Sequence, residues 1–526
     1  MKTRIKQGLI ACGAVGLITS VGALTTQMDL VKACQTLNLN QLPSKYDPRP
    51  WAIPVRNQHA PNGDSQNLCW SYSGNDMLTF AKQKAFGITS LYSPTYTDKA
   101  TAVDGLWDYP DLNQLKNLER LVNGGGHIAA ASILGILGHN PVLESDLPST
   151  DADGIATGAI ARNRLLADEF EALNAKADKS FSVTDVNRIG YQDGQETQAQ
   201  HDTAIKKALL KSGGVGYAFN AYTVKPGEDG FVAGYYNPDT AALYTEPTND
   251  ETLTISATEN INHVTLIVGY DDNYAKTNFN PAHRPQHNGA FLVRNSWGTA
   301  FGQAGYFWVS YEDFYIKASL AASSVNVGQP LAGHAQALRD TSARNSPFYV
   351  DYPNDIGLVD QPANANGDIV LGVKFPAKDH QLTLTSVSVD TDLANVNYEM
   401  YLVKDGFTET DNLADLKKQG TLIKKGFEAS QGEHRRAIKP VQIPANQAYS
   451  LVVVERAQDK SLNNKGAQLF VTSAANLVSP KTAMFGYIDA SDKLVWRDFY
   501  DVRTGTHRGS AVRTVVPYIF AYSAEK

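Results

Sequence analysis

Apolar and polar positions predict helices and strands mixed over the first 320 residues of this chain. In residues 69–82 apolar or small side chains recur every three or four positions, which predicts a helix with one buried face; they are Trp70, Ser73, Met77, Phe80 and Ala81. Residues 261–270 form a β-rich run that is apolar on both faces, which predicts a buried strand. Residues 290–294 predict a second strand, in hairpin order with the first.

After residue 327 the pattern changes to short β-rich runs separated by clusters of Gly, Asn, Asp and Pro. Such spacing is typical of an all-β sandwich. The runs are residues 369–375, 382–389, 398–403, 449–455, 469–472 and 512–520. A chain of 526 residues is too long for one compact core, so we expect two globular domains with a boundary between residues 320 and 345.

The N-terminal segment has the pattern of a secretory signal. Lys2, Arg4 and Lys6 precede an uncharged apolar run over residues 8–23 that ends in small residues, so we expect cleavage after Ala23. An uncleaved anchor is the alternative, although a membrane span needs about 20 apolar residues. No other stretch predicts a span, so we expect an extracellular protein, secreted or attached to the cell surface, with no membrane span after signal removal.

Composition and charge exclude several classes. A hydrophobic content of 42% excludes general disorder. The net charge is −7 and basic residues are spread singly, so no nucleic-acid partner is expected; the densest basic stretch, residues 404–436, is interpreted as solvated surface. Only Cys34 and Cys69 remain after signal removal, too few for a disulfide framework. Metal-binding and nucleotide-binding motifs are not found, so neither a metal nor a cofactor is implied.

Cys69 opens the predicted helix, directly after a turn-rich loop. The free N–H groups and dipole of a helix N-terminus stabilise a thiolate, although a cysteine alone is equally well read as a small buried hydrophobe. His263 lies in the first buried strand and Asn295 follows the second, so a hairpin would bring the amide beside the imidazole. The three side chains together predict a nucleophile, its base and an orienting group.

Four segments resemble motifs of the papain family of cysteine peptidases, in the family's order. They are V-R-N-Q at 55–58, C-W-S-Y-S at 69–73, N-H with G-Y at 262–270, and N-S-W-G with F-G and G-Y-F at 295–307. The likeness covers about residues 42–320. It implies an α+β, two-lobed papain-like protease domain that hydrolyses bonds in peptide or protein substrates.

The resemblance also implies residue roles. Cys69 would attack the peptide carbonyl, resting as a thiolate beside a His263 imidazolium, and Gln58 with the Cys69 N–H would donate to the oxyanion. Asn295 would hold the imidazole, and Trp297 would screen that contact from water. The implied substrate-binding residues are Gly124 and Gly125, which would lie against the substrate backbone, and Ile261 and Val264, which would wall an apolar pocket.

The chain departs from the family pattern before the nucleophile. Residues 59–68 form a longer connection than usual between glutamine and cysteine, so Gln66 is an alternative oxyanion donor, although Gln58 keeps the motif. The usual Cys-Gly-Ser before the nucleophile is replaced by residues 66–68, so the family's structural disulfide is absent. Residues 24–44 are too few for the usual helical propeptide.

We therefore expect a signal peptide at 1–23, a linker at 24–44, a papain-like protease domain at 45–325 and a β-sandwich domain at 340–526. The last part resembles the lectin-like domain that follows the protease in some bacterial members, and a cell-wall glycan is its candidate ligand. Trp496, Phe499 and Tyr500 could stack on sugar rings, with burial as the alternative. Since every catalytic motif precedes residue 320, removal of 345–526 is expected to leave chemistry on small peptides.

Two other functions compete with the peptidase. A papain-like chain can be a catalytically inactive binding or adhesion protein of the bacterial surface, but here all four catalytic positions are filled. A cell-wall amidase of the related Cys-His type is the second alternative. The Asn-Ser-Trp motif favours the peptidase.

Overall fold

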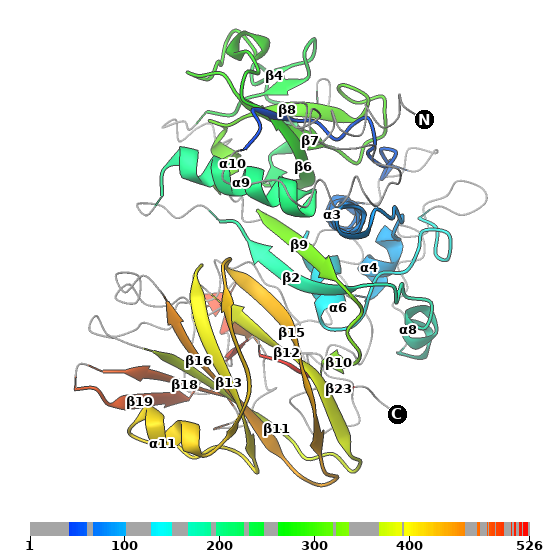
Figure 1. Ribbon diagram of the computed structural model, residues 1–526. Helices are drawn as coiled ribbons and strands as arrows, with labels where there is room; N and C mark the ends of the chain where they lie inside the picture. The colour runs from blue at the N-terminus through cyan, green and yellow to red at the C-terminus, as the bar shows by residue number, and fades with distance from the viewer. Residues whose placement is uncertain are drawn as a thin grey trace, which may run out of the picture.

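The computed structural model describes residues 42–59, 67–100, 128–149, 167–190, 196–225, 231–246, 261–318, 322–335, 368–391, 394–457, 471–473, 481, 483–489, 491–498, 506–507, 510–511, 515–517 and 519–523 (Figure 1). The predicted signal peptide and most of the predicted linker lie outside these residues. No helix within the described ranges is both long enough and apolar enough to span a bilayer.

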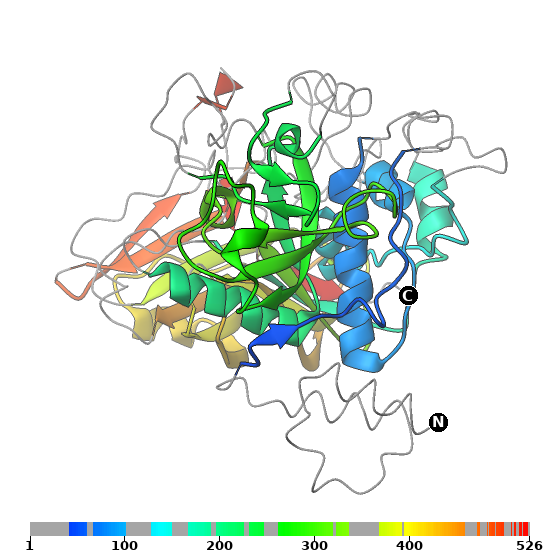
Figure 2. The same cartoon turned by 90° about the horizontal axis from the view of Figure 1, so that it is seen from above.

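Helix α3 (Cys69–Phe86) confirms the predicted helix and lies at the centre of the protease half. The sequence predicted one buried face, whereas every residue from Cys69 to Lys82 is buried. The reason is that α3 is packed between a seven-stranded sheet and the short helices α4 (Pro94–Ala100) and α6 (Ala130–Ile136) (Figures 1 and 2). A further short helix, α8 (Ala167–Asn174), lies at the edge of this group. A Cβ on Gly74 would lie 2.4 Å from the Ile128 carbonyl oxygen, so only glycine allows this approach.

The seven-stranded sheet forms the second lobe. Its strand order is β1-β6-β7-β8-β5-β4, with β3 also paired to β6. The strands are β1 (Lys45–Tyr46), β3 (Val215–Phe219), β4 (Tyr236–Asn237), β5 (Ala242–Leu243), β6 (His263–Asp271), β7 (Ala290–Arg294) and β8 (Tyr306–Ser310). Strands β6 and β7 are antiparallel neighbours, which confirms the predicted hairpin order.

Both faces of this sheet are covered, which explains why β6 reads as apolar throughout. Leu266 and Val268 belong to the hydrophobic cluster that includes α3 residues Met77 and Leu78. The alternate residue Ile267 points into a second cluster with α9 (Gln198–Ser212) and α10 (Phe314–Ala318). Period-two alternation therefore sends apolar side chains into two different cores.

The C-terminal half is a β sandwich of two six-stranded sheets (Figure 1). One sheet has the order β14-β13-β16-β11-β18-β19. Its strands are β11 (Ile369–Phe375), β13 (Val396–Lys404), β14 (Thr421–Glu428), β16 (Tyr449–Ala457), β18 (Ala483–Ile488) and β19 (Leu494–Asp498), with α11 (Leu413–Lys418) beside them. The sandwich confirms the predicted fold class. Of the predicted strand 512–520, residues 515–517 form β22 (Val515–Pro517), which confirms that part, whereas residues 519 and 520 are not in a strand and precede the separate strand β23 (Ala521–Ser523). Residues 512–514 and 518 lie outside the described residues.

Two further pairs of short strands complete the described elements. Strand β17 (Val471–Ser473) pairs with β22, and β20 (Thr506–His507) pairs with β21 (Ser510–Ala511). Two 3-10 turns, η2 (Ala221–Thr223) and η5 (Lys276–Asn278), lie in loops of the protease half.

The second sheet of the sandwich contains strands from both halves of the chain. Its order is β10-β23-β12-β15-β2-β9. Its strands are β2 (Ser182–Arg188), β9 (Ser323–Gly328), β10 (His334–Ala335), β12 (Leu382–Thr391), β15 (Gly432–Ile443) and β23. Because β2 pairs with β15 and β10 pairs with β23, backbone hydrogen bonds join the protease half to the β sandwich.

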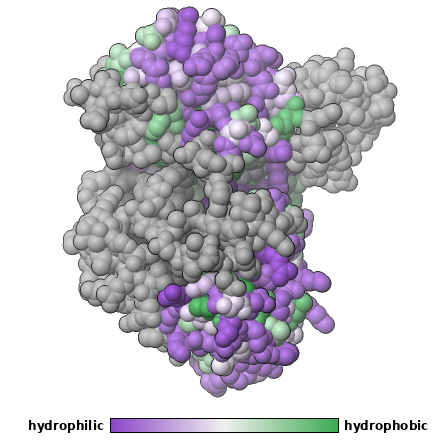
Figure 3. All heavy atoms as spheres, turned by 90° about the vertical axis from the view of Figure 1, so that its left-hand side faces the viewer, coloured by the Kyte–Doolittle hydropathy of each residue, from purple (hydrophilic) through white to green (hydrophobic). Residues whose placement is uncertain are grey.

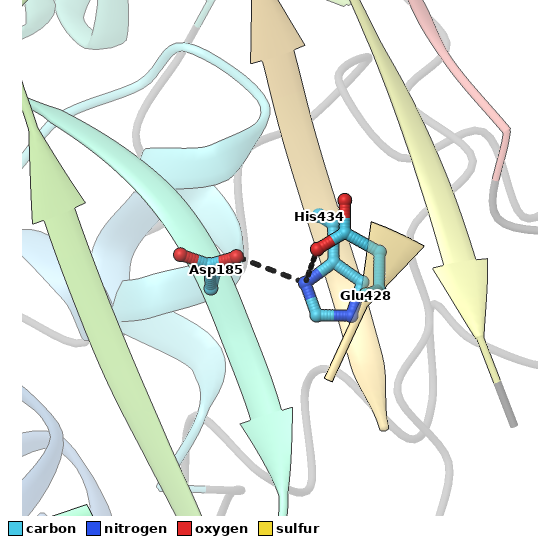
Figure 4. Close-up of side chains that lie close together, drawn as sticks. All are labelled: Asp185, Glu428 and His434. Carbon is cyan, nitrogen blue, oxygen red and sulfur yellow. Dashed lines mark hydrogen bonds and ion pairs between the residues drawn. The ribbon is translucent and has the colours of Figure 1, made fainter. Parts of the chain in front are cut away.

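A buried polar cluster lies where β2 meets β15 (Figure 4). The Asp185 carboxylate faces Nδ1 of His434 at 2.9 Å and accepts from Nη2 of Arg436 at 2.6 Å. Arg436 also donates to both oxygens of Glu428. Burial alone would raise the pKa of Asp185, but His434 and Arg436 more than offset it and hold that pKa well below its usual range. The halves are therefore joined by compensated charges as well as by backbone pairing.

The interpretation of residues 404–436 as solvated surface is wrong for the arginines of β15. Arg435 is buried, lies 3.9 Å from the centroid of the Tyr522 ring and donates to the Gly333 carbonyl at 2.8 Å. Its charge is thus satisfied within the junction. The face shown in Figure 3 is mainly hydrophilic where it is described, with apolar residues scattered over it.

A second buried ion-pair network holds the protease half together around Asp76 of α3. Its carboxylate accepts from Nη2 of Arg56 at 2.5 Å and from Nε of Arg294 at 2.8 Å. Arg294 also donates to the carbonyls of Ile53 and Pro54. Burial would raise the pKa of Asp76, yet the two guanidinium groups offset it and the pKa lies below its usual range.

We expect Asp76→Asn to lower the free energy of unfolding by about 3–5 kcal/mol, since it leaves two buried guanidinium groups without their counter-charge. Urea unfolding measures the change. Asp271→Asn is the matched control, because its partner Lys45 has a side chain that is 54% exposed, and about 1 kcal/mol or less is expected there. Since the folded pKa is lowered, the contribution of Asp76 is present above the unfolded pKa, about 3.9, and is lost as the pH falls through the folded value. Equal losses at the two positions would contradict the network's role.

The sheet that contains strands from both halves changes what we expect of a fragment that ends at residue 335. Strand β2 would lose β15, β10 would lose β23, Asp185 would lose His434 and Arg436, and Arg188 would lose Asp390. We therefore expect this fragment to be unfolded or aggregated, and not to retain the activity that the motif positions predicted. Circular dichroism and gel filtration test this. A monomeric fragment with a cooperative unfolding transition would show that the protease half needs no β sandwich.

Candidate active site

Cys69 is the first residue of α3, and the chain enters the helix without a side-chain cap. Asn67 adopts a positive φ of 49°, and Leu68 at the N-cap position makes no side-chain hydrogen bond to the helix. The N–H groups of Cys69 and Trp70 are therefore left for other partners, and both lower the pKa of the thiol. The side chain of Cys69 is buried, as the prediction of a buried helix start requires.

His263 is the first residue of β6, and its ring meets the amide of Asn295 directly after β7. Nε2 of His263 lies 2.8 Å from Oδ1 of Asn295. The same Oδ1 accepts from the Ser296 N–H at 2.7 Å, which identifies it as the amide oxygen. Nε2 must therefore donate, so in a neutral ring the proton sits on Nε2 and Nδ1 carries the lone pair.

The thiol lies beside the strand that carries this histidine. Val264, the next residue in β6, packs against the cluster formed by Cys69, Leu68, Trp70 and Ala130. A backbone group of Val264 also hydrogen-bonds the thiol. The structure thus brings cysteine, histidine and asparagine to the meeting point of α3 and the seven-stranded sheet.

Aromatic rings enclose the imidazole. The Trp297 ring stacks on it with centroids 4.4 Å apart, and the edge of Phe219 approaches with centroids 5.7 Å apart. His263 and Asn295 are both buried, at 3% and 2% exposure. The rings therefore hold the imidazole plane and keep water away from its bond to Asn295.

Gln58 is tied to the segment that follows Asn295. Its backbone N–H donates to the Ser296 carbonyl at 2.7 Å, and its Oε1 accepts from the Ser296 hydroxyl at 2.7 Å. Asn57 forms a bridge with Trp297 one position away, which continues the pairing. Because Ser296 fixes the amide oxygen, Nε2 is the end of the Gln58 side chain that remains for a substrate.

Burial acts against the resting charges that the resemblance implies. Burial raises the pKa of the Cys69 thiol, despite opposing hydrogen bonds from backbone groups. Burial lowers the pKa of His263 to about 3, against a smaller opposite effect of the Asn295 hydrogen bond. Both directions favour a neutral thiol and a neutral imidazole, where the resemblance implies a thiolate and an imidazolium.

Of the remaining predicted residues, Val264 lies at the thiol, whereas Ile261 is partly buried and packs against both cores of the protease half. Gly124, Gly125 and the rival donor Gln66 lie outside the described residues. Sequence reasoning missed Ser296 as the partner of Gln58, although it stands within the Asn-Ser-Trp motif. Sequence reasoning also missed Asp76. The available signal was an acidic residue within a helix that was predicted from its apolar positions.

One cluster in the described ranges has metal-ligand residue types, Asp185, Glu428 and His434, with ligand atoms within 4.8 Å of one another. The Arg436 guanidinium already donates to both carboxylates, so their charge is compensated by the protein. This cluster belongs to the junction with the β sandwich, and we assign no metal to it.

Comparisons with known proteins support the fold. Residues 169–323 match the family model of papain family cysteine proteases. No curated protein matches the sequence. Two solved structures of Cwp84, a surface layer associated protein of Clostridium difficile, share the fold.

Each Cwp84 structure is 20% identical in sequence and covers 92% of this chain. The cysteine protease after propeptide cleavage matches with a TM-score of 0.58 over 99% of its own chain. The structure of the cysteine protease and lectin-like domains matches with a TM-score of 0.59 over 89% of its chain. Residues 169–323 thus match the papain family of cysteine proteases, and the chain has the papain-like fold followed by a C-terminal β domain.

Proposed function

We propose that this peptidase cuts peptide bonds outside the cell, with Cys69 as nucleophile, His263 as proton carrier and Asn295 as the group that orients the imidazole. The observation that carries the proposal is the 2.8 Å bond from His263 to Asn295, formed next to a cysteine at a helix N-terminus. Export is supported by the signal-like residues 1–23, and the Cwp84 structures are of a surface layer associated protein.

The reaction follows from the hydrogen-bond directions. Sγ of Cys69 attacks the carbonyl carbon as its proton passes to Nδ1 of His263, and the carbonyl oxygen becomes an oxyanion. Gln58 Nε2 and the Cys69 N–H donate to that oxyanion. His263 then gives the proton to the leaving nitrogen, the C–N bond breaks, and the acyl group remains on Sγ. Water, deprotonated by His263, releases the acid product.

The β domain has a structural part in this proposal. It supplies the strand partners of β2 and β10. A glycan ligand remains a prediction: Trp496 stacks on Phe407 and donates to the Thr410 carbonyl, and both contacts anchor it within the fold, while Phe499 and Tyr500 lie outside the described residues. Domain limits of 45–325 and 340–526 are likewise retained as proposals.

The proposal is tested by labelling with an epoxysuccinyl inhibitor and by peptide turnover. Mass spectrometry should find the adduct on Cys69, and Cys69→Ala should remove both labelling and hydrolysis. Cys34→Ala is the matched control and should still be labelled. Hydrolysis that survives Cys69→Ala in a folded protein would refute the nucleophile. A folded wild type without labelling or turnover would favour an inactive binding protein.

Gln58→Ala should lower kcat by about a hundredfold or more, the usual loss for one oxyanion donor. Ser296→Ala should cost less, because it frees Oε1 of Gln58 but leaves the donating amide in place. Steady-state kinetics on one peptide compare the two variants. If Gln66→Ala is the crippling change and Gln58→Ala is nearly silent, the oxyanion donor has been assigned wrongly.

A further inference from the structure

Two basic side chains gather around the ring that covers the active-site histidine. Nζ of Lys225 lies 4.8 Å from the centroid of the Trp297 ring. The ring of His59 stacks on the same indole with centroids 6.5 Å apart. Trp297 in turn stacks on His263. The peptidase motifs do not account for either Lys225 or His59.

The backbone before Lys225 is fixed relative to β6. The η2 turn begins with an Asn220 cap, and its first residue, Ala221, donates its N–H to Oδ1 of Asn262 at 2.8 Å. Asn262 directly precedes His263. Val224 is 2% exposed and packs in the core of the sheet lobe. Lys225 therefore follows an anchored, buried residue and is not at the tip of a loose loop.

The order of bond breaking identifies the part of the substrate that lies near Lys225 and His59. His263 hands its proton to the leaving nitrogen, so the residue on the C-terminal side of the cut must lie against the imidazole. Trp297 covers that imidazole, and Lys225 and His59 flank Trp297. The leaving-group side of the cleft is therefore the side that carries the positive charge.

Electrostatics agree with this placement. Burial is the main reason for the low pKa of His263, and the charges of Lys225 and His59 lower it further. Both groups thus act on the imidazole through space. The same positive charges that disfavour protonation of His263 would attract a substrate carboxylate near Trp297.

We propose that Lys225 is a specificity-determining residue that favours a carboxylate in the substrate just C-terminal to the cut, with His59 adding to the positive field. The carboxylate can come from an Asp or Glu side chain or from the free C-terminus of a short leaving peptide. This inference rests on the proposed function of Cys69 and His263.

The test compares kcat/KM for internally quenched peptides that differ only in the first residue after the cut. Wild type should favour Glu over Gln by about three- to fivefold, the size of a partly exposed ion pair, and the ratio should shrink at 1 M salt. Lys225→Met should bring the ratio close to one, Lys225→Arg should preserve it, and Lys225→Glu should reverse it. Because each ratio is taken within one variant, a general loss of activity cancels.

A second pair of peptides separates the two sources of carboxylate. In this pair the leaving group is a dipeptide whose first residue is neutral and whose C-terminus is either a free acid or an amide. The two values of kcat/KM are compared. A preference for the acid that Lys225→Met removes assigns the C-terminal carboxylate, and a preference confined to Glu assigns the side chain. Lys418→Met in α11 of the β domain changes the net charge equally and should leave both ratios as in wild type.

The outcomes separate this inference from the function on which it rests. Turnover of the neutral peptides with neither a Glu preference nor a free-acid preference, or with preferences that persist in Lys225→Met, overturns the role of Lys225 alone. Absence of turnover for all peptides, together with absence of labelling at Cys69, overturns the peptidase assignment and the inference with it.

Discussion

The carboxylate of Asp76, buried between two guanidinium groups, fixes the relative positions of the three segments from which the active site is built. Asp76 stands seven residues after Cys69 in α3, about 10 Å along the helix axis. Arg294 directly precedes Asn295, and Arg56 stands two residues before Gln58. A displacement of any one segment would leave a buried charge unpaired, which costs several kcal/mol.

This ion-pair network lets the catalytic groups sit on regular, buried elements. Cys69 is held by a helix, His263 by a strand paired on both sides, and Gln58 by a short ladder with residues 296–298. The Lys225 segment follows the η2 turn, which is secured by Asn262. The groups that must be placed most accurately for chemistry are thus those with the fewest degrees of freedom.

Periodicity and motif order were enough to predict the helix at 69–82, the two strands of the active site, the β sandwich, and the meeting of His263 with Asn295. These features could be predicted because they depend on local patterns, which a single sequence contains. The partners of Asp185 and Asp390 lie more than 200 residues away in sequence, so no local pattern marks Arg436 or Arg188 as members of ion pairs. For the same reason the sequence alone favours a solvated surface for residues 404–436, which include the start of β15, because the partner strand β2 lies far away in sequence.

The pairing of β2 with β15 also determines when the protease half can finish folding. Asp185 and His434 are 249 residues apart, and β10 pairs with residues 522–523, near the last described residue. Contacts this distant in sequence form slowly, because the loop between them must close first. During synthesis the edge of β2 that faces β15 has no partner until residues 432–434 have been made. A chain whose protease half cannot finish folding before its β sandwich is made also cannot complete the site around its cysteine before then.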